Sequence, residues 1–206
     1  MDKRRLLIAV RLLFGFLVLA AAIIQAVSLQ QAGVFDPINY LSYFTNLSNI
    51  LAATIFIIST GYLIKRRPPT KTDDIIRGAS VLYMAVTGVV YVSLLSGIEV
   101  SLQIPWINIL LHYIMPVVVV IDWLYQPQKN QLSFSNILSW LLFPAAYLIY
   151  SLLRGAYIGW YPYPFLNPAS VGGYGNVALY CAGILIVFLV LGILLMKLGN
   201  AFKRHV

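Results

Sequence analysis

The stretch YGNVALYCAGILIVFLVLGILLM, residues 174–196, contains no charged residue. A helix rises about 1.5 Å per residue, so a stretch of this length crosses the roughly 30 Å of hydrocarbon in a bilayer. Five further apolar runs of similar length occur, which predicts an all-α integral membrane protein with six transmembrane helices. They form a single membrane domain, residues 1–206, with expected spans at 6–28, 41–64, 77–97, 105–125, 134–154 and 174–197.

The composition of the whole chain supports this class. Hydrophobic residues make up 61% of it and charged residues 10%, with a mean hydropathy of +0.86. A soluble domain has about 45–50% apolar and about 25% charged residues. The composition excludes a soluble cytosolic enzyme and a disordered nucleic-acid-binding tail, so no nucleic acid partner is expected. The single cysteine, Cys181, permits neither an intrachain disulfide nor a cysteine-rich metal site, and we expect no metal or other cofactor.

The basic residues predict how the helices are oriented. Of the 14 Lys and Arg residues, all but Arg154 fall on one side of the expected membrane, together with both termini. Lys and Arg are enriched in cytoplasmic segments, so both termini are expected in the cytoplasm. The basic residues behind the net charge of +8 are then explained by topology, and contact with anionic lipids is the only further role considered for them. The expected location is the plasma membrane in a bacterium or the endoplasmic reticulum in a eukaryote.

Polar residues occupy two of the expected spans near the predicted outer surface. Thr45 and Asn49 are four residues apart, as are Asn108 and His112, so each pair shares one face of its helix. Counting from the outer ends of the two spans, Thr45 lies roughly 6 Å and His112 roughly 10 Å into the membrane. The hydroxyl and the imidazole can therefore meet if the two spans are neighbours.

A threonine and a histidine at one depth indicate nucleophilic catalysis. A hydroxyl is a weak nucleophile that needs a base within hydrogen-bond reach, and histidine can accept the proton and return it. Pro116 has no N–H, which leaves the carbonyl of His112 without its usual donor and predicts a kink, a water or a partner side chain there. Asp122 lies about 15 Å beyond His112, too far to complete a triad, and is expected to pair with basic loop residues.

The same residues also allow a non-catalytic interpretation. Threonine hydroxyls in membrane helices often bond to a carbonyl of their own helix, and asparagines often join neighbouring helices. A single buried histidine is also common in a packed core. On this interpretation the chain is a non-enzymatic multi-pass membrane protein, such as a small transporter or an interaction subunit.

Three short stretches carry a resemblance to a known family. They are Tyr43-Phe-Thr-Asn-Leu-Ser-Asn49, His112 ahead of Pro116, and Tyr163-Pro-Phe-Leu166 before the last span. Their order and placement resemble the family of the androgen-induced protein and the androgen-dependent tissue-factor-pathway-inhibitor-regulating protein, with the chain similar to microbial members. That family consists of intramembrane threonine hydrolases that cleave fatty acid esters of hydroxy fatty acids. The resemblance implies Thr45 as nucleophile, His112 as catalytic base and a lipid substrate taken from the bilayer.

Further candidates surround this pair. Hydrolysis of an ester requires donors for the oxyanion, which Asn46, Asn49 or Asn108 could supply. Arg154 is expected either to anchor its helix at the interface or, since the family's lipids carry a free carboxylate, to bind that group.

The connection before the last span is rich in aromatic residues and prolines. It is expected to lie in the interface as an aromatic belt or to cover the site as a lid, with Tyr163 and Phe165 in contact with substrate. The chain contains no G-x-S-x-G motif, which excludes a nucleophile elbow of the soluble lipase type. The sequence predicts no particular oligomeric state.

Overall fold

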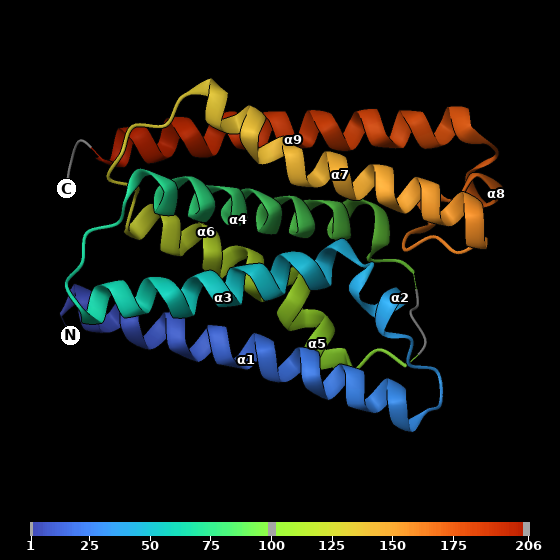
Figure 1. Cartoon of the computed structure of the whole chain (residues 1–206), viewed down its shortest axis with the longest axis horizontal. Helices are drawn as coiled ribbons and strands as arrows, with labels where there is room; N and C mark the ends of the chain where they lie inside the picture. The colour runs from blue at the N-terminus through green and yellow to red at the C-terminus, as the bar shows by residue number, and fades with distance from the viewer. Residues whose placement is uncertain (1, 99–101, 204–206) are drawn as a thin grey trace.

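The computed structural model describes residues 2–98 and 102–203, which form an all-helical bundle (Figure 1). As predicted, the described residues form an all-helical structure in which six helical segments are long and apolar enough to cross a membrane, which is consistent with a multi-pass membrane protein. Four of them are single helices: α1 (Lys3–Gln31), α3 (Phe44–Ile64), α7 (Phe134–Ile158) and the last, α9 (Tyr174–Lys203).

The other two spans each contain a turn of π-helix. The third span is α4 (Lys71–Val90) continued by the π-helix η1 (Tyr91–Leu95). The fourth is made of α5 (Pro105–Ile109), the π-helix η2 (Leu110–Ile114) and α6 (Met115–Tyr125). A π turn inside an α-helix is rare and occurs frequently at functional sites.

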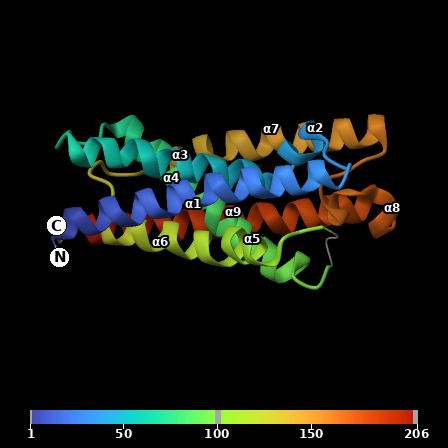
Figure 2. The ribbon, with the colours of Figure 1, turned by 90° about the horizontal axis from the view of Figure 1, so that it is seen from below.

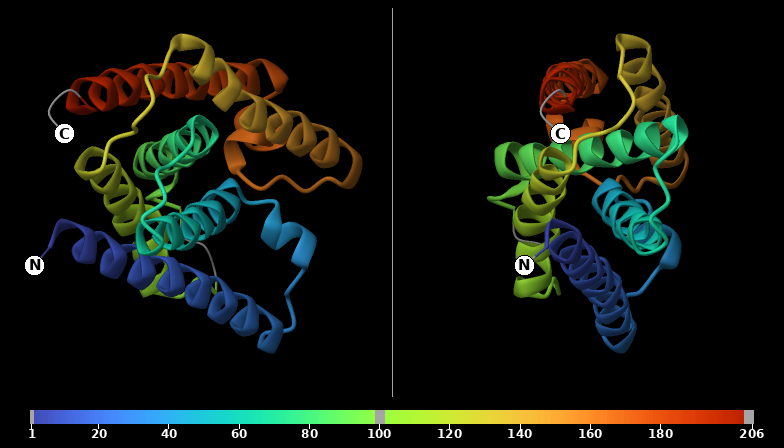
Figure 3. Two further views of the ribbon diagram at one scale, coloured as in Figure 1. Left: turned by 60° about the vertical axis from the view of Figure 1, so that its left-hand side comes forward. Right: turned by 90° about the vertical axis from the view of Figure 1, so that its left-hand side faces the viewer.

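Helix α4 is the centre of the bundle. It packs on α3, α6, α7 and α9, while α1 packs along α3 (Figure 3). The start of α1 and the end of α9 lie at one end of the bundle, here called the termini end (Figure 1). The opposite end, here called the α8 end, carries the short helices α2 (Pro37–Leu41), η3 (Pro164–Leu166) and α8 (Pro168–Val171) (Figure 2).

Two helix starts differ from the expected spans for local reasons. The side chain of Asp36 accepts hydrogen bonds from the N–H groups of Ile38 and Asn39, at 2.8 and 3.0 Å. It thereby caps a separate short helix, α2, which ends at Leu41, and the membrane helix α3 starts at Phe44 rather than at residue 41. Thr70 and Asp73 form a capping box that starts α4 at Lys71 rather than at residue 77.

A buried charged cluster joins three helices at the termini end. Asp122 of α6 accepts two hydrogen bonds from Arg11 of α1, at 2.7 and 2.9 Å, and one from Arg77 of α4 at 2.7 Å. The expectation that Asp122 pairs with loop residues is therefore wrong, because both partners lie inside helices. A carboxylate in this position offsets two guanidinium groups that could not stay buried without a counterion. The cluster fixes the relative positions of α1, α4 and α6.

Candidate active site

Thr45 occupies the second position of α3, at the α8 end of the bundle. Its backbone N–H donates to the hydroxyl of Tyr163 at 3.1 Å, and its own hydroxyl oxygen lies 3.3 Å from the same Tyr163 oxygen. Thr54 and Thr87, in contrast, donate to the carbonyl four residues earlier in their helices, at 2.8 and 2.9 Å. Among the described residues, only Tyr163 hydrogen-bonds the Thr45 hydroxyl, which is therefore not tied to its own helix.

His112 lies in η2 with a defined protonation pattern. Its Nδ1 is 3.1 Å from the backbone carbonyl oxygen of Asn108. A carbonyl can only accept, so Nδ1 carries the proton and Nε2 carries the lone pair. No side chain or backbone group in the described part of the chain donates to Nε2. This is the tautomer that a general base requires.

Tyr91 and Asn108 hold the imidazole in place. The rings of Tyr91 and His112 stack with their centroids 3.9 Å apart and their planes 20° from parallel. The side-chain amide of Asn108 donates to the Tyr91 hydroxyl at 2.7 Å, so one asparagine orients both rings. Tyr91 was not predicted from the sequence, since it belongs to a different span and no motif links it to His112.

Pro116 explains the π turn at His112. In an α-helical register the missing N–H of Pro116 would leave the carbonyl of His112 unpaired. In the structure the N–H of Met115 donates to Leu110, five residues earlier, so the register is that of a π-helix. In this register the donor missing at Pro116 is the one for Leu111. In the π register the carbonyl of Leu111, next to His112, is therefore one that lacks its backbone donor.

Asn49 supplies the partner side chain for that carbonyl. Its amide nitrogen donates to the carbonyl oxygen of Leu111 at 3.2 Å and to that of Thr45 at 2.9 Å. The first bond connects α3 with η2, which shows that the helices of Thr45 and His112 are neighbours, as the catalytic hypothesis requires. It also uses the N–H groups of Asn49 for packing.

The other two asparagines have structural partners as well. Asn46 donates to the carbonyl oxygen of Tyr40 at 2.7 Å and so connects α3 to α2. Asn108 connects α5 to η1 through Tyr91. Each of these two amides keeps a second N–H, and Asn46 lies on the wall of the cavity described next.

Thr45 and His112 both line a cavity of about 600 Å³ at the α8 end, here called the polar cavity because many hydroxyl and amide groups lie in its wall. Both residues line it, along with Tyr163 and several aromatic and amide side chains, among them Asn39, Tyr40, Tyr43, Asn46, Tyr91, Trp160 and Asn167. Thr45 and His112 are each only 7% exposed. Within the described residues no hydrogen bond joins them directly, so the cavity rather than a contact relates the two groups.

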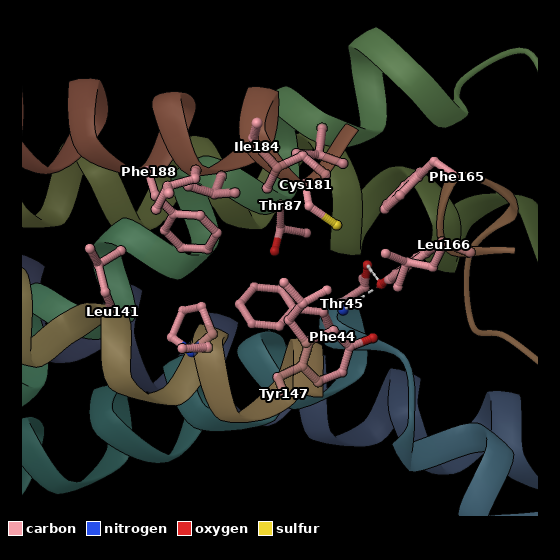
Figure 4. Close-up of a pocket in the computed structure, with 18 of the residues that line it drawn as sticks. Phe44, Thr45, Thr87, Leu141, Tyr147, Phe165, Leu166, Cys181, Ile184 and Phe188 are labelled. Carbon is pink, nitrogen blue, oxygen red and sulfur yellow. Dashed lines mark hydrogen bonds between the residues drawn. The ribbon is translucent and has the colours of Figure 1, made fainter. Parts of the chain in front are cut away.

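A second cavity, of about 350 Å³, lies on the other side of Thr45 and is almost entirely apolar. Figure 4 shows Thr45 near Phe165 and Leu166 at one end of this cavity, with Leu141 and Phe188 toward the other end. Thr45, Leu95 and Tyr163 belong to the walls of both cavities. The hydroxyl of Thr45 is thus placed where a polar and an apolar compartment adjoin.

The segment that connects α7 to α9 folds inward over both cavities. The ring of Tyr163 is nearly parallel to that of Phe165, with centroids 5.1 Å apart and planes 8° apart. It meets the ring of Tyr43 in an edge arrangement, with centroids 5.8 Å apart. Phe165 and Leu166 are buried. Burial raises the pKa of the Tyr163 phenol, so the group stays a neutral hydroxyl at physiological pH.

Arg154 lies near the outer wall of the polar cavity. It donates to the side-chain oxygen of Asn39 at 2.7 Å, and its guanidinium lies 4.9 Å from the ring centre of Trp160. Both of these partners line the polar cavity. The second terminal nitrogen of Arg154 is buried and, within the described residues, hydrogen-bonds to no other group.

The comparisons with known proteins identify no relative: no family model, no curated protein and no solved structure matches the chain. Within the described residues, no group of three His, Cys, Asp or Glu side chains is placed to hold a metal ion.

The bond between Asn49 and Leu111 can be tested by substitution. Asn49→Leu leaves the Leu111 carbonyl buried without a donor, which should cost about 1–2 kcal/mol of unfolding free energy. It should also loosen the position of His112 relative to Thr45. Thermal unfolding in detergent micelles measures the first effect.

Asn176→Leu is the matched control, because Asn176 also donates its amide to a backbone carbonyl, that of Val171, but at an exposed position. We expect this control to change stability by less than about 0.5 kcal/mol. Equal stability losses in the two variants would contradict a special role for Asn49.

Proposed function

We propose that the protein is an intramembrane lipid ester hydrolase with Thr45 as nucleophile and His112 as base. The observation that carries this proposal is the shared cavity. Thr45, whose hydroxyl is not bonded to its own helix, and His112, whose Nε2 has no partner in the described part of the chain, both line the polar cavity. The resemblance of the sequence to intramembrane threonine hydrolases supports the same pair.

The reaction follows from this arrangement in two steps. Nε2 of His112 accepts the proton of the Thr45 hydroxyl while the Thr45 oxygen attacks the ester carbonyl carbon. The tetrahedral intermediate collapses, the C–O bond to the alcohol breaks, and His112 returns the proton to the leaving alcohol. A water then gives a proton to Nε2 and attacks the acyl-threonine carbonyl carbon. The bond from that carbon to the Thr45 oxygen breaks, Nε2 returns the proton to the Thr45 oxygen, and the fatty acid is released. Catalytic hydrogen bonds often form only with substrate bound, which fits the absence of a Thr45–His112 bond among the described residues.

The two cavities suggest how such a substrate is held. The apolar cavity suits an acyl chain, whose burial is favourable in proportion to its area. The polar cavity suits the alcohol part of the ester and the hydrolytic water. Thr45 lies between the two, where the ester group would be. The substrate class is therefore a long-chain ester that enters from the surrounding lipid.

The orientation proposed from the basic residues places the site at the outer surface. With both termini in the cytoplasm, the α8 end and its two cavities face the opposite side of the membrane. The host membrane is the plasma membrane if the organism is a bacterium and the endoplasmic reticulum if it is a eukaryote.

Removing either member of the pair should abolish turnover. We expect Thr45→Ala and His112→Ala each to reduce hydrolysis of the 4-methylumbelliferyl ester of hexadecanoic acid at least 100-fold, with expression and melting temperature maintained. The double variant should be no worse than the single ones, because the two groups act as one unit. Initial rates in detergent micelles measure this.

Thr54→Ala controls for the loss of a threonine hydroxyl from the same helix, since Thr54 is exposed and bonded only to its own helix. It should retain full activity. Turnover retained in a folded Thr45→Ala or His112→Ala protein would contradict the mechanism.

Arg154 is proposed to bind a carboxylate on the substrate. One of its nitrogens is buried and has no partner among the described residues, and the side chain contacts two residues of the polar cavity, so positive charge lies beside the expected alcohol part. A guanidinium can bind a carboxylate through two parallel hydrogen bonds. The lipids of the resembled family carry such a group.

For this role we expect Arg154→Gln to raise KM several-fold for a fatty acid ester of a hydroxy fatty acid. The methyl ester of the same lipid has no charge to lose and should be hardly affected. Arg154→Lys keeps the charge but not the planar guanidinium group, so its KM for the free acid should lie between those of the wild-type protein and Arg154→Gln. An identical change in KM for acid and methyl ester would instead indicate that Arg154 only anchors its helix.

A further inference from the structure

The hydroxyl of Tyr163 lies where a reacting carbonyl oxygen would have to lie. Its oxygen is 3.1 Å from the backbone nitrogen of Thr45, from which it accepts a hydrogen bond, and 3.3 Å from the Thr45 hydroxyl oxygen. In a near-attack arrangement the carbonyl carbon is about 3–3.5 Å from the nucleophile. Donors to the oxyanion lie about 2.7–3.1 Å from its oxygen. An ester oxygen at the Tyr163 position meets the donor distance. Its carbonyl carbon, about 1.2 Å away, can then lie within reach of the Thr45 hydroxyl.

The helix that carries Thr45 leaves its first N–H groups available. The first N–H groups of a helix have no partner within it and carry partial positive charge. The N-cap residue of α3, Tyr43, provides no side-chain acceptor, so the Thr45 N–H is satisfied from outside the helix by Tyr163.

A second polar group of the same cavity also lacks a partner within the part of the chain that the structure describes. His112 is 7% exposed, its Nε2 accepts no hydrogen bond from the described residues, and the residue lines the cavity that Tyr163 and Thr45 line.

The side-chain amides expected to bind the oxyanion are largely engaged elsewhere. Asn49 donates to two backbone carbonyls, and Asn46 and Asn108 each donate to another residue at 2.7 Å. The backbone N–H of Thr45 can bind an oxyanion without any rearrangement of the bundle, once the Tyr163 hydroxyl has moved away from it.

We infer that the backbone N–H of Thr45 is the oxyanion donor and that the Tyr163 hydroxyl occupies the carbonyl-oxygen position until substrate displaces it. This inference rests on the proposed hydrolase function. It adds a second role for Thr45 and a site that a side chain of the protein itself fills when no substrate is bound. The stacking of Tyr163 on Phe165 and its edge contact with Tyr43 involve only the ring. The ring can therefore keep its place when the hydroxyl is removed.

Tyr163→Phe removes the competing oxygen and leaves a space next to the Thr45 N–H. A carbonyl oxygen should then bind without displacing any group of the protein. We expect KM for the 4-methylumbelliferyl ester of hexadecanoic acid to fall at least threefold, with kcat not reduced. The matched control is Tyr83→Phe, which removes a buried hydroxyl bonded to the Trp140 carbonyl at 2.7 Å and is a change at a residue that lines neither cavity. It should change neither constant.

Binding without turnover separates this inference from the proposed function. Thr45→Ala keeps the backbone N–H but has no nucleophile, so the same ester can be titrated intact. Adding Tyr163→Phe to Thr45→Ala should lower the Kd for the ester at least threefold. Adding Tyr83→Phe should not.

The possible outcomes are distinct. A lower Kd together with an inactive wild-type protein would support the carbonyl site and contradict the hydrolase. Active wild-type protein with an unchanged Kd and KM after Tyr163→Phe would overturn the inference and leave the hydrolase standing. A tenfold fall in kcat at constant KM would also overturn it, because the hydroxyl would then be a catalytic donor rather than an occupant.

Discussion

The arrangement of the candidate site depends on one hydrogen bond, from the Asn49 amide to the carbonyl of Leu111. Pro116 removes a donor from its span, and the π register places the resulting unpaired carbonyl at Leu111. Within hydrocarbon such a group must find a partner in the protein. Asn49 provides it from α3, which holds the helix of Thr45 against the helix of His112. The position of both candidate catalytic groups therefore follows from a backbone requirement.

The two ends of the bundle are stabilised by different interactions. At the termini end, Arg11, Arg77 and Asp122 form a buried charged cluster that joins three helices. At the α8 end, neutral hydrogen bonds and aromatic contacts around Tyr91 and Tyr163 form the walls of the cavities. Charged pairs fix one end tightly, while weaker neutral contacts at the other end are easier to exchange for a substrate. This division is suited to a site that must open to a lipid.

Much of the fold and part of the site followed from the sequence. Apolar length predicts the six spans. Counting along the spans predicts similar depths for Thr45 and His112, and in the structure both residues line one cavity. In the sequence Arg11 and Arg77 look like topology signals of a terminus and a loop. Only the folded bundle shows that both pair with Asp122 inside it. The stack of Tyr91 on His112 and the bond from Thr45 N–H to Tyr163 join residues of different segments, so no local pattern predicts them. The starts of α3 at Phe44 and of α4 at Lys71 also differ from the ends of the apolar runs, and the capping box of Thr70 and Asp73 explains the second.

The central claim is that Thr45 is an activated nucleophile. The most direct measurement is mass spectrometry of the protein after treatment with a fluorophosphonate, which reacts covalently with activated hydroxyl groups. Peptide mapping should find the adduct on Thr45, and His112→Ala should eliminate it. A protein that stays unlabelled under conditions that label a known serine hydrolase, or one labelled on another residue with Thr45 unmodified, would contradict the account.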